Sequence, residues 1–372
     1  MKYNLSDICD YVRGKVDVAS LIYENYISTE NMISNKGGIT SASSLPSVAQ
    51  TQSFQVGDIL VSNIRPYFKK IWFAEFNGGC SNDVLVLRAK DGISKKFLYY
   101  VLTDDTFFNY SMITSKGTKM PRGDKAAIMK YEVPGFTYKE QEKIAKILEA
   151  FDKKIQLNSN INDNLEQQAR AIYQQMFIDN PDSSWELGIL SDIANITMGQ
   201  SPNSNSYNEE GNGTIFFQGR AEFGFRFPSV RLFTTEPKRM ACENDTLMSV
   251  RAPVGDLNVA HKDCCIGRGL AAIHSKNNHQ SFVHYTMFSL KKQLNVFNGE
   301  GTVFGSINRN ALNEMPILIP SDEKLDKFES IVAPMDAAIR NNYDEICRLE
   351  QLRDTLLPKL MSGELDVSDI DL

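Results

Sequence analysis

The chain has 372 residues, of which 42% are hydrophobic and 23% charged, an ordinary composition for globular proteins that excludes disordered and fibrous classes. No run of 18 apolar residues is present and no apolar segment follows Lys2, so we expect no membrane-spanning helix and no secretory signal. The net charge of −6 argues against a uniformly basic nucleic-acid binder. Six scattered cysteines without a CxxC pair predict free thiols in a cytoplasmic protein.

Residues 1–137 are expected to form a first mixed α/β domain. Short apolar runs at 58–64 and 84–87 are broken by Gly, Pro, Asn and Ser, a pattern typical of strands and turns, and 94–102 is predicted to be helical. Basic and amide side chains gather near these turns, and such groups can neutralise phosphates and contact base edges. The candidate DNA contacts of this domain are Asn63, Arg65, Lys69, Lys70, Lys116, Thr118, Lys119 and Arg122.

Residues 138–180 are predicted to form a long helix, the first spacer. Apolar residues follow a heptad pattern in which Ile144 occupies position a and Leu148 position d. The pattern places Asn158 at an a position and Asn162 at a d position, where a polar residue fixes the register of a coiled coil. The heptads rise roughly 50 Å at ~1.5 Å per residue, which would separate two flanking domains by about 15 base pairs of duplex.

Residues 181–320 repeat the first domain at an offset of about 185 residues. Leu-Ser-Asp-Ile at 5–8 recurs at 190–193, and the segment 58–66 recurs at 245–253. The fixed order of several such matches predicts two similar domains. Basic residues recur as well, Arg226 and Arg231 among them, and the candidate DNA contacts of the second domain are Arg220, Arg251, Arg268, Thr302, Asn308 and Arg309.

Residues 321–372 are predicted to form the second helical spacer and a tail. The heptads recur at an offset of 184, with Asn342 at an a position, and Pro334 is expected to start or kink this helix while Pro358 disturbs its last turn. If the two helices pair antiparallel about a pseudo-twofold axis, Asn162 should face Asn342. The alternative is two independent amphipathic helices, each packed on a globular domain.

Charge is distributed unevenly among these regions. The first domain, counted to residue 139, holds 17 Lys and Arg against 13 Asp and Glu, and the second, from 187 to 320, holds 12 against 11. The helical regions between and after them hold 5 against 9 and 6 against 13. The acidity therefore belongs to the helices, and the domains remain candidates for DNA binding.

Motifs for catalysis or metal binding are weak or missing. The chain has no GxxxxGK[ST] loop, no GxSxG, no HExxH and only four histidines. Gly267–Ala272 fits GxGxxA but lacks a following helix, and we interpret it as a turn with close backbone approach. His261 lies three residues before Cys264, a spacing a metal site can use, but a strand end is the better interpretation. We predict no catalytic residue, bound metal or cofactor.

Several segments resemble the specificity subunit of type I restriction–modification enzymes. The resemblance covers nearly the whole chain and is carried most clearly by QEKIAKIL at 141–148, NINDNLE at 160–166 and LRDTLLPKLMSGEL at 352–365. IGRG at 266–269 and Gly-Thr at 301–302 also resemble recognition-domain segments. The resemblance implies an α+β protein with two target-recognition domains separated by an antiparallel coiled coil.

The same resemblance implies a non-catalytic adaptor that reads a bipartite target in double-stranded DNA. Its partners would be two methyltransferase subunits, which use S-adenosylmethionine to methylate adenine, and in systems with restriction subunits two of those, which use ATP and Mg. Three alternatives stay open: a partner with fused methyltransferase and nuclease as in some type II systems, a coiled-coil scaffold that binds only proteins, and a self-contained enzyme.

Overall fold

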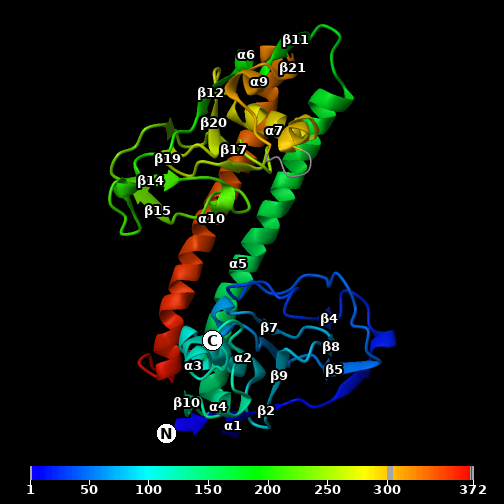
Figure 1. Cartoon of the computed structure of the whole chain (residues 1–372), viewed down its shortest axis with the longest axis vertical. Coiled ribbons are helices and arrows are strands. Elements are labelled where there is room, and N and C mark those ends of the chain that lie inside the picture. Colours follow the sequence, from blue (N-terminus) through cyan, green and yellow to red (C-terminus); the bar gives the residue numbers. More distant parts are fainter. Residues whose placement is uncertain (1, 300–304, 369, 371–372) are drawn as a thin grey trace. The chain divides into compact units, whose positions relative to one another are not determined.

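The computed structural model describes residues 2–299, 305–368 and 370, which divide into two compact units (Figure 1). The first unit comprises Met1–Leu157 with Glu345–Leu372, and the second comprises Asn158–Asp344. Both division points fall inside the long helices α5 (Tyr138–Tyr173) and α10 (Asp322–Ser362). Each unit therefore contains one mixed domain together with a segment of each long helix.

Two small sheets and four short helices form the described part of the first unit's mixed domain. One sheet has the order β2-β9-β6-β7 with antiparallel neighbours, and the other has the order β3-β5-β8-β4 with β4 and β8 parallel. A third pairing joins β1 to β10 next to the start of α5. The strands are β1 (Lys2–Asn4), β2 (Cys9–Tyr11), β3 (Lys15–Asp17), β4 (Tyr26–Ile27), β5 (Gln50–Phe54), β6 (Ile59–Ser62), β7 (Ile71–Phe73), β8 (Gly78–Cys80), β9 (Val84–Ala89) and β10 (Glu132–Pro134). The helices are α1 (Leu5–Ile8), α2 (Lys95–Thr103), α3 (Asp105–Ile113) and α4 (Lys125–Ile128), with 3-10 turns η1 (Val18–Ser20) and η2 (Pro66–Phe68).

The second unit repeats the main elements of the first in the same order, with one more strand in its second sheet. Its sheet β12-β20-β17-β18 repeats β2-β9-β6-β7, and its second sheet has the order β13-β15-β14-β19-β16. The strands are β11 (Glu186–Ile189), β12 (Ala194–Met198), β13 (Tyr207–Asn208), β14 (Thr214–Phe217), β15 (Leu232–Thr234), β16 (Met240–Ala241), β17 (Thr246–Ser249), β18 (Leu257–Val259), β19 (Cys264–Ile266), β20 (Leu270–Ser275) and β21 (Pro316–Ile319). The helices are α6 (Leu190–Ile193), α7 (Gln280–Ser289), α8 (Lys291–Leu294) and α9 (Arg309–Asn313), with 3-10 turns η4 (Ser204–Ser206), η5 (Arg220–Glu222) and η6 (Asn295–Asn298). The predicted duplication of a mixed domain is confirmed.

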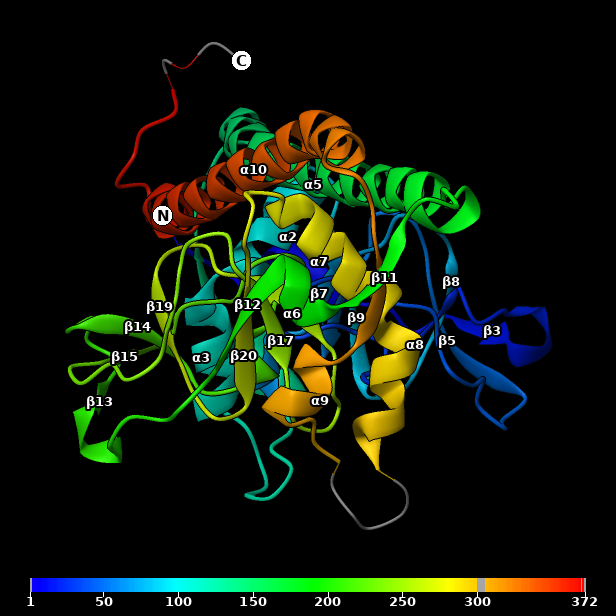
Figure 2. The ribbon, with the colours of Figure 1, turned by 90° about the horizontal axis from the view of Figure 1, so that it is seen from above.

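One helix in each unit lies between the sheet and the long helices. Ser94 caps α2 by accepting a hydrogen bond from the Phe97 N–H, which is why the predicted helix begins there. The Tyr100 hydroxyl donates to Asp152 of α5 at 2.7 Å, and at the equivalent repeat position the Tyr285 hydroxyl of α7 donates to Asp336 of α10 at 2.9 Å. Figure 2 shows α7 in this intermediate layer. The same bond thus ties each mixed domain to a long helix.

The long helices pair antiparallel within each unit. In the first unit Arg353 forms an ion pair with Asp152 at 2.9 Å, and in the second the Asn342 amide donates to the Asn162 side chain at 2.8 Å. Every predicted a and d position is buried or half-buried. The predicted coiled-coil pairing and the contact between Asn162 and Asn342 are confirmed, and the alternative of two independent helices is wrong.

The expectations that Pro334 starts the second long helix and that Pro358 disturbs its last turn are wrong. Helix α10 begins at Asp322 and is continuous through both Pro334 and Pro358 to Ser362. Buried Phe328 and Val332 on one side of Pro334, and Leu357 and Leu360 around Pro358, explain this, because packing of the apolar face outweighs the loss of a backbone donor. The first long helix differs slightly from the predicted continuous α-helix. Helix α5 ends at Tyr173 and is followed by the π-helical segment η3 (Gln174–Asp179), which contains the last heptad residue.

Candidate nucleic-acid interface

Two loops of the first unit bring most of its predicted DNA contacts together. The backbone of Ile64, just after β6, forms a bridge with Arg122, and the Arg65 N–H donates to the Pro121 carbonyl at 2.8 Å. Lys116 forms a second bridge with Arg122. The predicted residues of 63–70 and 116–122, far apart in the sequence, therefore share one surface.

Many of these side chains are already paired with neighbours. Lys69 binds Asp105 at 2.7 Å and Arg122 binds Asp83 at 3.1 Å. Lys116 forms an ion pair with Asp124 at 2.5 Å. The Lys116 ammonium holds the pKa of the Asp124 carboxyl below its usual range. Of the remaining predicted residues, Lys70 donates to the Thr29 carbonyl at 2.6 Å, and Thr118 and Lys119 are exposed in the turn. Asn63 Oδ1 and Arg65 Nε are buried and have no hydrogen-bond partner among the residues that the structure describes.

These ion pairs lie at the surface, and each has at least one well-exposed member. A surface pair contributes only ~0–1 kcal/mol, since each charge was well solvated before pairing. A phosphate has the same charge as the carboxylate that it would replace. The paired lysines therefore remain available as phosphate contacts, with Asp83, Asp105 and Asp124 as the groups they would leave.

The second unit repeats this loop arrangement. Arg251, after β17, forms a backbone bridge with Ser306, and the neighbouring Val250 N–H donates to the Gly269 carbonyl at 3.0 Å. The bridge is equivalent in the repeat to that between Ile64 and Arg122. Arg251, Arg268 and Arg309 thereby reach one surface, where all three are exposed and without a side-chain partner among the described residues.

The other predicted residues of the second unit have different surroundings. Asn308 caps α9, its side-chain oxygen accepting from the Ala311 N–H at 2.9 Å, as Asp124 caps α4 in the first unit. Arg220 is paired with Asp256 at 2.5 Å. Thr302 lies outside the described residues. The second surface thus depends most on its three unpaired arginines.

Two basic residues noted in the sequence have structural partners instead. Arg226 is buried, where it bonds Asp336 of α10 and donates to the His284 ring at 2.7 Å. It is not available to DNA, because the mixed domain packs on α10 at this point. Arg231 binds Glu222 and Glu209.

The two weaker motifs have ordinary structural explanations. Gly267 and Gly269 flank a turn in which an added Cβ would lie 2.9 Å from the Gln218 carbonyl oxygen, so close backbone approach requires both glycines. A strand, β20, follows the turn. His261 contacts Asp344 at 2.8 Å while Cys264 is buried in β19.

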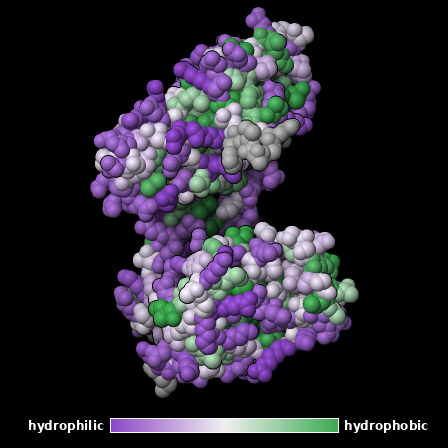
Figure 3. Space-filling model, viewed as in Figure 1, coloured by the Kyte–Doolittle hydropathy of each residue, from purple (hydrophilic) through white to green (hydrophobic). Residues whose placement is uncertain are grey.

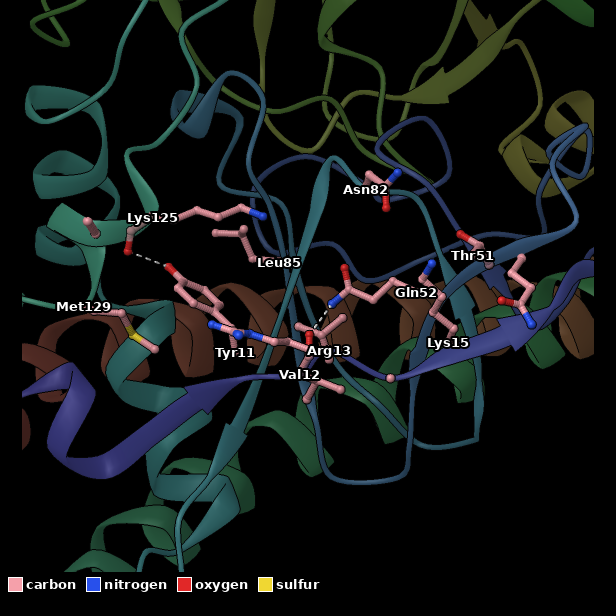
Figure 4. A pocket seen from close by; sticks show the side chains of 14 residues that line it. Tyr11, Val12, Arg13, Lys15, Thr51, Gln52, Asn82, Leu85, Lys125 and Met129 are labelled. Carbon is pink, nitrogen blue, oxygen red and sulfur yellow. Dashed lines mark hydrogen bonds between the residues drawn. The ribbon is translucent and has the colours of Figure 1, made fainter.

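One feature of the first unit was missed from the sequence. A hollow of about 680 Å³ lies beside the predicted loops, lined by Arg13, Lys15 and Lys125 among others (Figure 4). The repeat offers a signal for it, because Lys125 is equivalent to Arg309, a predicted DNA contact of the second unit. Arg13 and Lys15 have no such counterpart, since Met198 and Gln200 occupy those positions.

The face of the molecule drawn in Figure 3 is mostly polar. On the face drawn in Figure 3, hydrophilic residues dominate and apolar residues form small separate patches. Within the part of the chain that the structure describes, no helix is long and apolar enough to cross a membrane.

Comparison with known proteins agrees with these features. The family model described as type I restriction modification DNA specificity domain matches residues 1–167 and 182–351. A putative type I restriction enzyme MjaX specificity subunit from Methanocaldococcus jannaschii is 30% identical over 339 residues, covering 84% of this chain and 79% of that protein. The type I restriction enzyme HindI specificity subunit from Haemophilus influenzae is 22% identical and covers 98% of this chain and 99% of its own.

The fold is also found in a solved structure. The type I restriction-modification S subunit from M. genitalium aligns with a TM-score of 0.64 at 19% identity, covering 99% of this chain and 96% of that one. The family model matches both mixed domains and most of both long helices. The chain therefore belongs to the family of type I restriction–modification specificity subunits.

Proposed function

We propose that this specificity subunit reads a bipartite target in double-stranded DNA, one half with each mixed domain, and has no catalytic centre of its own. The observation that carries the proposal is the repeated loop arrangement, which presents cationic side chains after β6 in one unit and after β17 in the other. Arginine and lysine supply both phosphate neutralisation and bidentate donors for guanine edges. The long helices would set the unread spacer between the halves.

We further propose that bound methyltransferase subunits use S-adenosylmethionine to methylate adenine at this target. Restriction subunits, where present, would add ATP- and Mg-dependent cleavage. The acidic helical regions, with 11 Lys and Arg against 22 Asp and Glu, suit protein partners better than phosphates. The absence of a recognisable nucleophile or nucleotide-binding motif in the sequence supports an adaptor role.

Methylome sequencing of cells that carry this chain with its methyltransferase partner tests the proposal. We expect methylated adenines within a motif of two short defined halves separated by undefined bases. The purified chain alone, incubated with labelled S-adenosylmethionine and DNA, should transfer no label. A motif without a gap, or label transferred by the chain alone, would contradict the proposal.

Arg251→Ala tests the second half of the target. Loss of a base-reading arginine should weaken binding by about 1–3 kcal/mol and relax one position of that half. Fold integrity should be kept, because the Arg251 side chain is exposed and unpaired among the described residues. Lys276→Ala is the matched control, since Lys276 donates to the Ser191 carbonyl at the far end of β20. Unchanged motif and affinity in Arg251→Ala would remove Arg251 from the recognition surface.

A further inference from the structure

The hollow in the first unit combines an apolar floor with a cationic rim. We call it the basic hollow and define it by Tyr11, Arg13, Lys15, Asn82, Leu85 and Lys125. Leu85 is buried at its floor and Tyr11 is half-buried, with its hydroxyl donating to the Lys125 carbonyl at 3.1 Å. Figure 4 shows the Lys125 side chain extending over Leu85. The hollow is open to solvent and belongs to a single unit.

The rim cations differ from the other predicted contacts of this unit. Arg13, Lys15 and Lys125 are exposed, and none has an ion pair or side-chain hydrogen bond among the described residues. Lys69, Lys116 and Arg122, by contrast, each bind a carboxylate. Three positive charges around one concavity, each without an ion pair among the described residues, attract an anion.

The basic hollow adjoins the two loops that hold the predicted contacts of 63–70 and 116–122, which we call the recognition loops. Asn82 on its rim is followed by Asp83, which binds Arg122, and Lys125 is preceded by Asp124, which binds Lys116. A polyanion that contacts the loops would therefore pass the hollow. At the equivalent positions of the repeat, the second unit has Arg309 in place of Lys125 and Gly199 in place of Gly14.

We infer that the basic hollow seats the sugar–phosphate backbone of one DNA strand at the first half of the target. Arg13, Lys15 and Lys125 would each neutralise a phosphate, while the adjoining loops reach the base edges. A hollow suits a convex backbone, whereas base edges lie within the DNA grooves and are reached by protruding loops. This inference rests on the proposed function and adds the position of the backbone and the residues that hold it.

The variant Arg13→Ala/Lys15→Ala/Lys125→Ala tests the inference on the full-length chain. Binding to a 30-base-pair duplex that carries the methylome-derived target is measured as a function of salt, beside an unrelated duplex. Each lost phosphate contact should reduce the magnitude of the slope of log affinity against log salt by about 1, so the triple variant should lose about 3. Affinity for both duplexes should fall by similar factors, and the methylated motif should stay unchanged.

The matched control is Lys95→Ala/Lys139→Ala/Lys146→Ala, which removes the same charge from exposed lysines of α2 and α5 with no partner among the described residues. Its slope should equal that of the wild type. An equal loss in both variants, an unchanged slope in the hollow variant, or a changed motif would each overturn the inference. Failure of the proposed function looks different, because the wild-type chain would then not prefer the target duplex at all.

Discussion

Two amides in the helical seam show how single polar residues define the pairing of α5 and α10 in the second unit. Asn162 accepts a hydrogen bond from Asn342 and donates to the Ile339 carbonyl at 3.3 Å. Both amides have partners only when the helices are in this register. A shifted register would leave a buried amide unpaired, at a cost of about 1–3 kcal/mol. The polar seam positions were recognisable from the sequence because they interrupt an apolar heptad pattern.

A buried histidine has a role that its sequence position does not indicate. His284 on α7 accepts from Arg226 at Nε2, so its proton lies on Nδ1, which donates to Thr246 at 3.1 Å. Burial, and after it the positive charges of Arg226 and Arg170, hold the pKa of His284 well below its ordinary value. The ring is thus neutral in the folded protein.

Stability should therefore depend on pH through His284. Its pKa is lowered in the folded state, so below about 6.5 the unfolded chain binds a proton that the folded chain does not. The contribution of the neutral His284 ring to the free energy of unfolding is complete above that pH, and it is lost progressively as the pH falls. Denaturant unfolding at several pH values should show a weaker acid-side decline in His284→Gln than in the wild type. Identical profiles in the wild type and His284→Gln would contradict the assignment.

At the scale of elements, α10 shows that packing and local preference can oppose each other. Pro334 is exposed in the helix interior and cannot donate to the carbonyl of Ser330, yet the helix is continuous. The expected start at Pro334 was wrong because buried side chains on the opposite face hold both sides of the proline in one helix. A proline rule applied to an isolated peptide omits this packing.

Pro334→Ala should accordingly stabilise the protein. The substitution restores a backbone donor and removes the ring contact, for an expected gain of about 2 kcal/mol, less than the full interior penalty because proline also restricts the unfolded chain. The midpoint of denaturant unfolding measures it. Ala337→Gly, at an exposed position of the same helix, should have the opposite sign at about 1 kcal/mol. A destabilised Pro334→Ala would mean that the proline is required where it stands.

For the whole molecule, the location of charge matters more than its total. The net charge of −6 belongs to the helical regions, whereas the mixed domains have a small excess of Lys and Arg. Phosphate contacts act over about a Debye length, ~8 Å at physiological salt, so distant acidic residues are screened. DNA binding by an acidic chain is thus physically consistent.

Charge reversal at two lysines distinguishes the effect of where a charge lies from the effect of the total net charge on DNA binding. Lys119→Glu, in the recognition loop, and Lys146→Glu, on α5, produce the same net charge, and both side chains are exposed. We expect Lys119→Glu to weaken DNA binding about tenfold or more and Lys146→Glu less than about twofold. Binding is measured by titration at physiological salt. Equal effects would show that total charge governs binding and that the segment 116–122 has no special part in it.

The sequence by itself determined the duplication, the helical seam, the amide contact between Asn162 and Asn342, and the family. These follow from repeated segments and from heptad periodicity, which are local patterns that a single chain displays in its order of residues. Only the tertiary structure decided which cations are paired, since Asp83 and Arg122, or Lys69 and Asp105, meet through folding and not through spacing. It also buried Arg226 and left Arg13, Lys15 and Lys125 unpaired around one hollow, because burial and ion pairing depend on which distant segments are brought into contact.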